Sequence, residues 1–108
     1  MELPSTKDIL TKARELISDE KHWIKGEYGV TAAGWPVDQE QLHEASCFCA
    51  IGAIVRAMQI LRKDDTLKRT PSELYAMLHL DSLSLIIFND RHTHPEVLKL
   101  FDDMIDAA

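Results

Sequence analysis

The chain of 108 residues has little of what stabilises small secreted or fibrous proteins. It has two cysteines, four glycines and four prolines, and aromatic side chains make up only 6% of it. Cys47 and Cys49 are separated by one residue, and cysteines at this spacing rarely form a good disulfide. So few glycines and prolines exclude a fibrous or low-complexity chain. The fold must therefore depend on a hydrophobic core, and hydrophobic residues, at 45% of the chain, are numerous enough to build one.

The chain also lacks a long apolar run. The longest, residues 47–55 counting Gly52, falls well short of the roughly 18 residues that a membrane span needs. Acidic residues are scattered through positions 1–20, where a signal peptide would need an apolar segment. We therefore expect a cytoplasmic protein that makes no contact with a membrane.

Positive charge is scarce, since 12 lysines and arginines stand against 18 aspartates and glutamates, for a net charge of −6. A chain with this balance has no general attraction for nucleic acid or anionic lipid. The central segment 47–70 carries five basic and two acidic residues and stands between two acidic segments, a pattern typical of charge balance on a solvated surface. We expect a protein partner and no direct binding of nucleic acid.

The hydrophobic pattern predicts a mainly α fold. Apolar residues recur at helical spacing in 9–17 and again in 97–105, so each segment has one apolar face. Patterns typical of helix starts, with a capping residue followed by an acidic residue or glutamine, stand at 5–8, 38–41, 70–73 and 93–96. Asp81 or Ser82 is expected to cap a short apolar helix over 83–88, which Asn89 would end.

The segment 47–61 is expected to form the centre of this fold. Arg56 and Gln59 are its only positions that are neither apolar nor glycine, and a helix that is apolar almost all round is buried almost all round. Residues 26–37 hold three of the four glycines and predict a loop or a small β-hairpin. The prediction is a compact bundle of about five or six helices around 47–61, in a single domain over 1–108.

One set of residues would suit nucleophilic catalysis. Cys49 would lie in the first turn of the central helix, where the helix dipole lowers a thiol pKa. His94 could serve as its base, with Asn89 or Asp90 orienting the imidazole. Free cysteine in an apolar helix is more often a buried core residue, however. The sequence therefore offers these four residues as candidates and favours a protein that is not an enzyme.

The histidines and cysteines of the chain are candidates for a zinc site. Two thiolates with two imidazoles would suit tetrahedral zinc. The C-x-C spacing is wrong, because structural zinc sites usually carry two to four residues between the cysteines. The residues considered were His43, Cys47, Cys49, His92 and His94. We expect no metal and no cofactor.

Two groups of residues are candidates for binding a partner. Trp23, Tyr28 and Trp35 stand around the glycine-rich segment, where aromatic side chains either form a recognition surface or close a small helical core. The second group is acidic and lies on the polar side of the last predicted helix. It consists of Asp102, Asp103 and Asp106.

Five short motifs occur in an order that resembles a known family. They are W-x-K-G at 23–26, G-x-P-V at 34–37, F-C-x-x-G-A at 48–53, N-D at 89–90 and T-x-x-E-V at 93–97. They resemble a family of small uncharacterised bacterial and phage proteins, a domain of unknown function, with Phe48 where that family usually has tryptophan. The likeness spans 16–105 and matches one cysteine, Cys49. It implies a fold unit and candidate residues, with no reaction attached.

These observations lead to three hypotheses of function. The first is a small non-catalytic interaction protein, associated with phages or mobile elements, that binds a macromolecular partner through an acidic surface. The second is a cysteine-dependent enzyme that uses Cys49 and His94. The third is a small-ligand binder with a pocket near Gly52. The oligomeric state is left open by the sequence.

Overall fold

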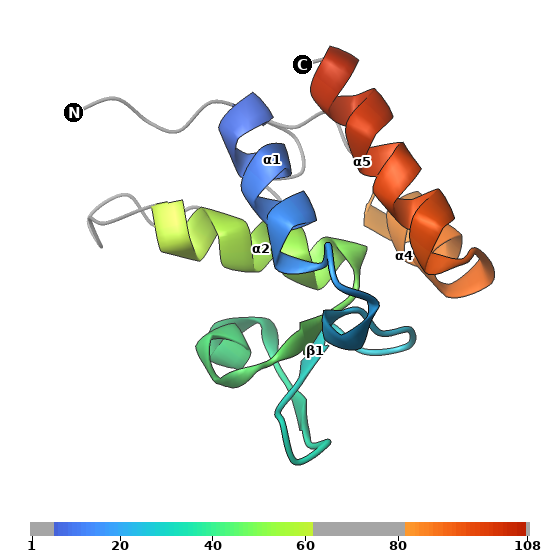
Figure 1. Cartoon of the computed structure of the whole chain (residues 1–108). Coiled ribbons are helices and arrows are strands. Elements are labelled where there is room, and N and C mark those ends of the chain that lie inside the picture. Colours follow the sequence, from blue (N-terminus) through green and yellow to red (C-terminus); the bar gives the residue numbers. More distant parts are fainter. Residues whose placement is uncertain (1–5, 62–81, 108) are drawn as a thin grey trace.

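The structure is a computed structural model that describes residues 6–61 and 82–107. It is mainly helical, with a small antiparallel sheet of three strands at one end (Figure 1). The α-helices are α1 (Thr6–Leu16), α2 (Ala50–Leu61), α4 (Ser82–Arg91) and α5 (His94–Ala107). The strands are β1 (Gly29–Val30), β2 (Pro36–Val37) and β3 (Cys47–Phe48). One 3-10 helix, η1 (Glu20–His22), lies between α1 and β1, and a second, η2 (Gln39–Glu44), lies between β2 and β3.

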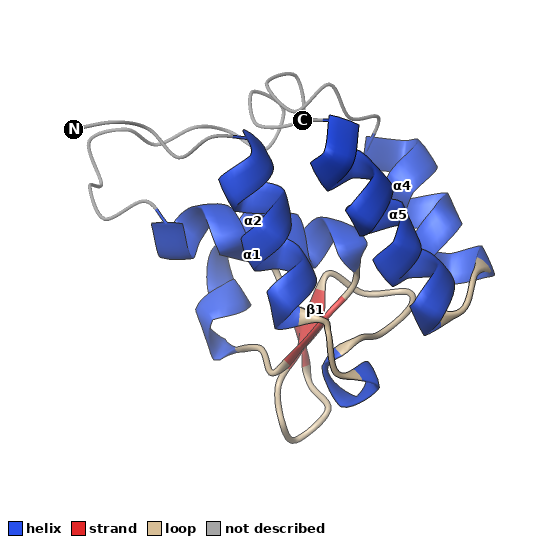
Figure 2. Ribbon diagram, turned by 45° about the horizontal axis from the view of Figure 1, so that its top comes forward, coloured by secondary structure: helices blue, strands red, loops and turns tan. Residues whose placement is uncertain are grey.

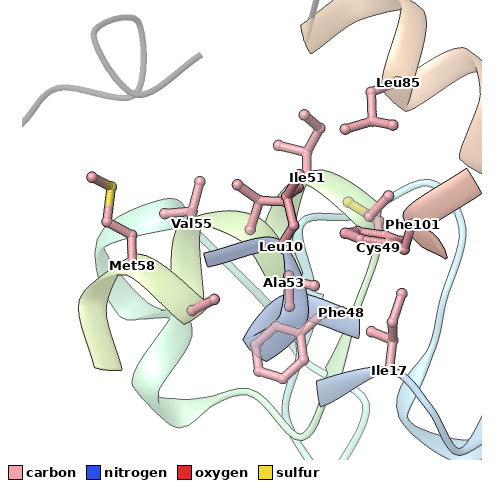
Figure 3. Close-up of a cluster of buried hydrophobic side chains, with 14 of the residues drawn as sticks. Leu10, Ile17, Phe48, Cys49, Ile51, Ala53, Val55, Met58, Leu85 and Phe101 are labelled. Atoms are coloured by element: carbon pink, nitrogen blue, oxygen red, sulfur yellow. The ribbon is translucent and has the colours of Figure 1, made fainter. Parts of the chain in front are cut away.

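Helix α2 is the buried centre of the fold. Every residue from Ala50 to Val55 is buried, as are Ala57 and Met58, because α2 is apolar on nearly all sides. It contacts α1, α4, η2 and β3, and its side chains meet theirs in one hydrophobic cluster (Figure 3). The prediction of a central buried helix is confirmed, although the helix begins three residues later than expected.

Helices α1 and α5 each bury one face. On α1 the buried positions include Ile9 and Ala13, and on α5 they include Val97 and Phe101, all fully buried. The start of α5 is the one expected, because Glu96 accepts hydrogen bonds from both the backbone and the hydroxyl of Thr93 at 3.0 and 2.9 Å. These bonds lower the pKa of the Glu96 carboxyl.

The three strands stand in the order β2-β1-β3, and both pairings are antiparallel. Gly29 pairs with Val37 on one side and with Phe48 on the other. The predicted loop or hairpin over 26–37 is therefore a hairpin, and β3 extends it to a sheet. In Figure 2 the strands lie together at one end, next to the helices.

The structure corrects the predicted elements at several places. Four α-helices are described in 6–61 and 82–107, fewer than the five or six predicted. The central helix starts at Ala50 because residues 47–48 pair with β1. The helix predicted to start at 38 is the 3-10 helix η2, which has a non-helical residue at Gln41. The helix starts expected at 5–8 and 70–73 lie wholly or partly outside the described residues.

Candidate functional site

Asn89 is fully buried and stands at the junction of three segments. Its Oδ1 accepts hydrogen bonds from Trp23 Nε1 at 2.7 Å and from the Ala50 amide at 3.0 Å. Its Nδ2 donates to the Ile24 carbonyl at 3.0 Å and to Asp90 Oδ1 at 3.3 Å. Both acceptor positions and both donor positions of the amide are thus occupied. Asn89 joins α4 to the start of α2 and to the extended segment around Trp23.

This position of Asn89 differs from the prediction. Asn89 was expected to end a helix over 83–88, but α4 continues to Arg91 and Asn89 lies within it. Its side chain bonds to Trp23, Ala50 and Ile24, all in other segments of the chain. Leu85 and Asn89 are four residues apart, and both lie on the buried face of α4.

Asp90 extends the junction toward Gly26. Its Oδ1 accepts a hydrogen bond from the Gly26 amide at 3.0 Å. Gly26 has a φ of 84°, in the left-handed region that side chains other than hydrogen disfavour. The motifs W-x-K-G and N-D are therefore two halves of one hydrogen-bonded contact, between residues 64 positions apart. Asp90 is itself exposed, and its carboxylate acts here as a backbone acceptor.

Cys49 immediately precedes α2 and caps it. Its carbonyl accepts the first helical hydrogen bond, from Ala53, and its Sγ lies 3.3 Å from the Gly52 amide that donates to it. The side chain is only 4% exposed and lies among the core side chains (Figure 3). Burial raises the pKa of the Cys49 thiol, and this effect exceeds the lowering by the amides at the helix start.

His94 is buried, and its ring is held by the backbone just after α1. Its Nε2 lies 2.6 Å from the Ile17 carbonyl oxygen, and since a carbonyl only accepts, Nε2 is the protonated nitrogen. Ile17 follows the last residue of α1, where helix carbonyls lack helical partners. The Trp23 ring lies 5.5 Å away, centroid to centroid. His94 thus fastens the start of α5 to the end of α1.

The four catalytic candidates are therefore gathered in one region but are engaged in other contacts. Asn89 bonds to the residue after Cys49, and Trp23 contacts both Asn89 and His94. No hydrogen bond joins Cys49 to His94 in the structure as described, and His94 and Asn89 are not bonded to each other. The arrangement holds the protein together and does not present a nucleophile with its base.

The residues weighed for zinc are spread over separate contacts. Within the described parts of the chain, no group of three or more potential ligands comes together. The Cys47 thiol donates to the Lys21 carbonyl at 3.1 Å, and His92 stacks on Phe88 at 3.7 Å between centroids. His43 is exposed on η2.

The binding candidates divide into engaged and exposed residues. Trp23 is half-buried and has His94 on one side and the Lys25 ammonium 5.6 Å from its ring. Tyr28 is 37% exposed and Trp35 is 71% exposed, the highest fraction among the large hydrophobic residues described. Of the aromatic group, Trp35 is therefore the side chain most available to a partner.

The acidic candidates on α5 are partly neutralised within the chain. Asp102 forms a close ion pair with Arg14 of α1, at 2.6 Å from Nε to Oδ1. Asp103 pairs with Lys99 at 3.4 Å. Asp106 is exposed near the end of the helix.

The Tyr28 backbone contacts Gly52, the residue where a ligand pocket was considered. A Cβ at position 52 would overlap the carbonyl oxygen of Tyr28, so glycine is required for β1 to approach α2 this closely. The Cys49 amide donates to the same carbonyl at 3.3 Å. This side of Gly52 is occupied by the backbone of Tyr28, the residue just before β1.

No helix in the described residues is long and apolar enough to cross a membrane.

Comparison with known proteins gives a family and no further relative. No curated protein and no solved structure matches the chain. The model of a family of unknown function, DUF6197, matches residues 1–107. The resemblance inferred from the five motifs is thus confirmed at the level of a family of unknown function, and the chain belongs to DUF6197.

Proposed function

We propose that this protein is a small non-catalytic interaction protein that binds a macromolecular partner through an acidic surface. The observation that carries the proposal is that Asn89 and Cys49, the motif residues best suited to chemistry, are bonded or buried within the chain. Asn89 uses all four hydrogen-bonding positions within the chain, and burial raises the pKa of the Cys49 thiol. Residues held in this way are better suited to stabilising the fold than to reacting with a substrate.

The distribution of charge supports binding of a basic partner. Between residues 19 and 48, six acidic side chains stand against two lysines, and all eight are exposed. The acidic residues are Asp19, Glu20, Glu27, Asp38, Glu40 and Glu44. An excess of exposed negative charge attracts a positively charged protein and repels nucleic acid and anionic lipid.

Salt dependence tests this proposal. A tagged form of the full chain is used to capture proteins at low salt, and each captured protein is then purified and rebound to the untagged chain. Binding should weaken steeply between about 0.1 M and 1 M salt, because the Debye length falls from about 10 to about 3 Å. Affinity that does not change over this range, or failure of every purified candidate to rebind, would contradict the proposal.

A further inference from the structure

The side chain of Trp35 is exposed on a backbone that is held in place. The Thr31 amide donates to the Trp35 carbonyl at 2.8 Å, and the Trp35 amide donates to Thr31 Oγ1 at 3.1 Å. Gly34 closes the turn with a φ of 90° and donates to the Thr31 carbonyl at 2.9 Å. An aromatic side chain on a pre-ordered backbone loses little conformational entropy on binding, which is the property of an interface anchor.

The hairpin lies at the end of the molecule opposite the C-terminal end of α5 (Figure 1). Trp35 immediately precedes β2, in which Val37 is buried. Strand β2 contacts η2, and a Cβ at Gly29, the partner of Val37, would lie 2.9 Å from Leu42 of η2. Trp35 is therefore exposed beside the strand against which η2 packs.

Exposed carboxylates stand on η2 and at its start. Asp38, Glu40 and Glu44 are exposed, and none of them forms an ion pair with another residue of the described chain. The carboxylates of Asp102 and Asp103 on α5, by contrast, each have a basic partner. Close to Trp35 in the chain, three exposed carboxylates therefore have no ion-pair partner among the described residues.

We propose that Trp35, Asp38, Glu40 and Glu44, together the hairpin surface, bind an arginine-containing basic segment of a partner protein. The proposal rests on the proposed function and names the surface and the chemistry of its partner. A guanidinium stacks on an indole face and pairs with carboxylates through a planar fork of donors, which suits this combination better than an ammonium. Two other occupants fit less well. A second copy of this chain would bring a surface of the same negative charge, and the negative charge of nucleic acid would be repelled.

The two indole N–H groups of the chain allow a direct test by NMR. Trp23 Nε1 is bonded to Asn89, whereas Trp35 is exposed, so their signals report on different regions. The full chain is titrated with an oligoarginine peptide and, separately, with an oligolysine peptide of the same length. With oligoarginine, we expect the Trp35 indole signal and the amide signals of 38–44 to shift and the Trp23 indole signal to stay in place. Oligolysine should bind more weakly than oligoarginine, by about threefold or more.

Matched variants locate the binding. The double variant Glu40→Gln/Glu44→Gln and the control Asp103→Asn/Asp106→Asn each remove two negative charges from exposed positions. Trp35→Ala should weaken oligoarginine binding by about tenfold, and the η2 double variant by about threefold or more, while the α5 control stays near wild type. Thermal melts of each variant confirm that it is folded.

Three outcomes would overturn the assignment of the hairpin surface. Shifts spread evenly over all acidic residues, equal losses in the two double variants, or a change in oligomeric state in place of peptide binding would each do so. If a purified natural partner binds the wild type and Trp35→Ala equally, the hairpin surface is wrong while the proposed function stands. If no partner rebinds at all, the proposed function itself fails.

Discussion

The start of α2 and the tip of the hairpin differ in where their polar and aromatic groups are directed. At the start of α2, Trp23 and Asn89 face inward and bond to each other and to nearby backbone. At the hairpin, the backbone makes the hydrogen bonds and the Trp35 side chain is left exposed. The two tryptophans of the chain therefore have different roles. The first fastens segments together, and the second is available to another molecule.

The largest effect is expected from removing the amide of Asn89. Asn89→Leu keeps the approximate volume but leaves the buried Ala50 amide and the partly buried Trp23 Nε1 and Ile24 carbonyl without their partner. The free energy of unfolding should fall by about 3–5 kcal/mol in urea denaturation. Ile87→Ala, at an exposed position of the same helix, should cost less than about 1 kcal/mol. Equal losses in the two variants would show that Asn89 is not the junction described here.

The next effect tests the contact between α2 and the sheet. Glycine to alanine within a helix ordinarily stabilises by up to about 1 kcal/mol. Gly52→Ala should instead destabilise by about 1–3 kcal/mol, because the new methyl group would overlap the Tyr28 carbonyl. A lower melting temperature of Gly52→Ala would support this close contact. A higher melting temperature would show that β1 does not approach α2 this closely.

A smaller effect follows from the buried thiol of Cys49. Its pKa is raised above the ordinary value of 9.0 by burial, so the unfolded chain ionises first as pH rises. The stability linked to this thiol is fully present below pH 9.0 and is lost as pH rises from there through the folded pKa. The free energy of unfolding should therefore fall more steeply above pH 9.0 in Cys47→Ser than in Cys47→Ser/Cys49→Ala.

The same pair of variants separates a buried cysteine from a nucleophile. In Cys47→Ser, where Cys49 is the only thiol, a thiol reagent should label the native protein slowly and the unfolded protein quickly. Rapid native labelling that depends on His94, measured with His94→Ala, would instead support the cysteine-dependent enzyme.

The smallest effect on stability is expected at the hairpin tip. Trp35→Ala should change the free energy of unfolding by no more than about 0.5 kcal/mol, because the side chain is 71% exposed. This near-neutral result, beside the loss of oligoarginine binding, would complete the contrast with Trp23. A loss of several kcal/mol would mean that Trp35 belongs to the core after all.

Local sequence was sufficient for the elements whose apolar pattern is strong. The apolar run after Cys49 places α2 in the centre, and the capping residues Thr93 and Glu96 place the start of α5. The glycines between 26 and 37 indicate the hairpin. These features depend on neighbours within one helical turn or one β-turn, so the residues themselves carry the information.

Tertiary structure alone decided what the motif residues do. Asn89 was interpreted as a helix end, yet it is the partner of residues 39 and 66 positions away. Cys47 and Phe48 belong to a strand because β1 stands beside them, although their apolar character also fits a helix. A buried amide chooses its partners from whatever segments the packing of the core brings within hydrogen-bonding distance. The spacing of residues along the chain does not specify which segments come within that distance. Only the packing of the helices and strands determines it.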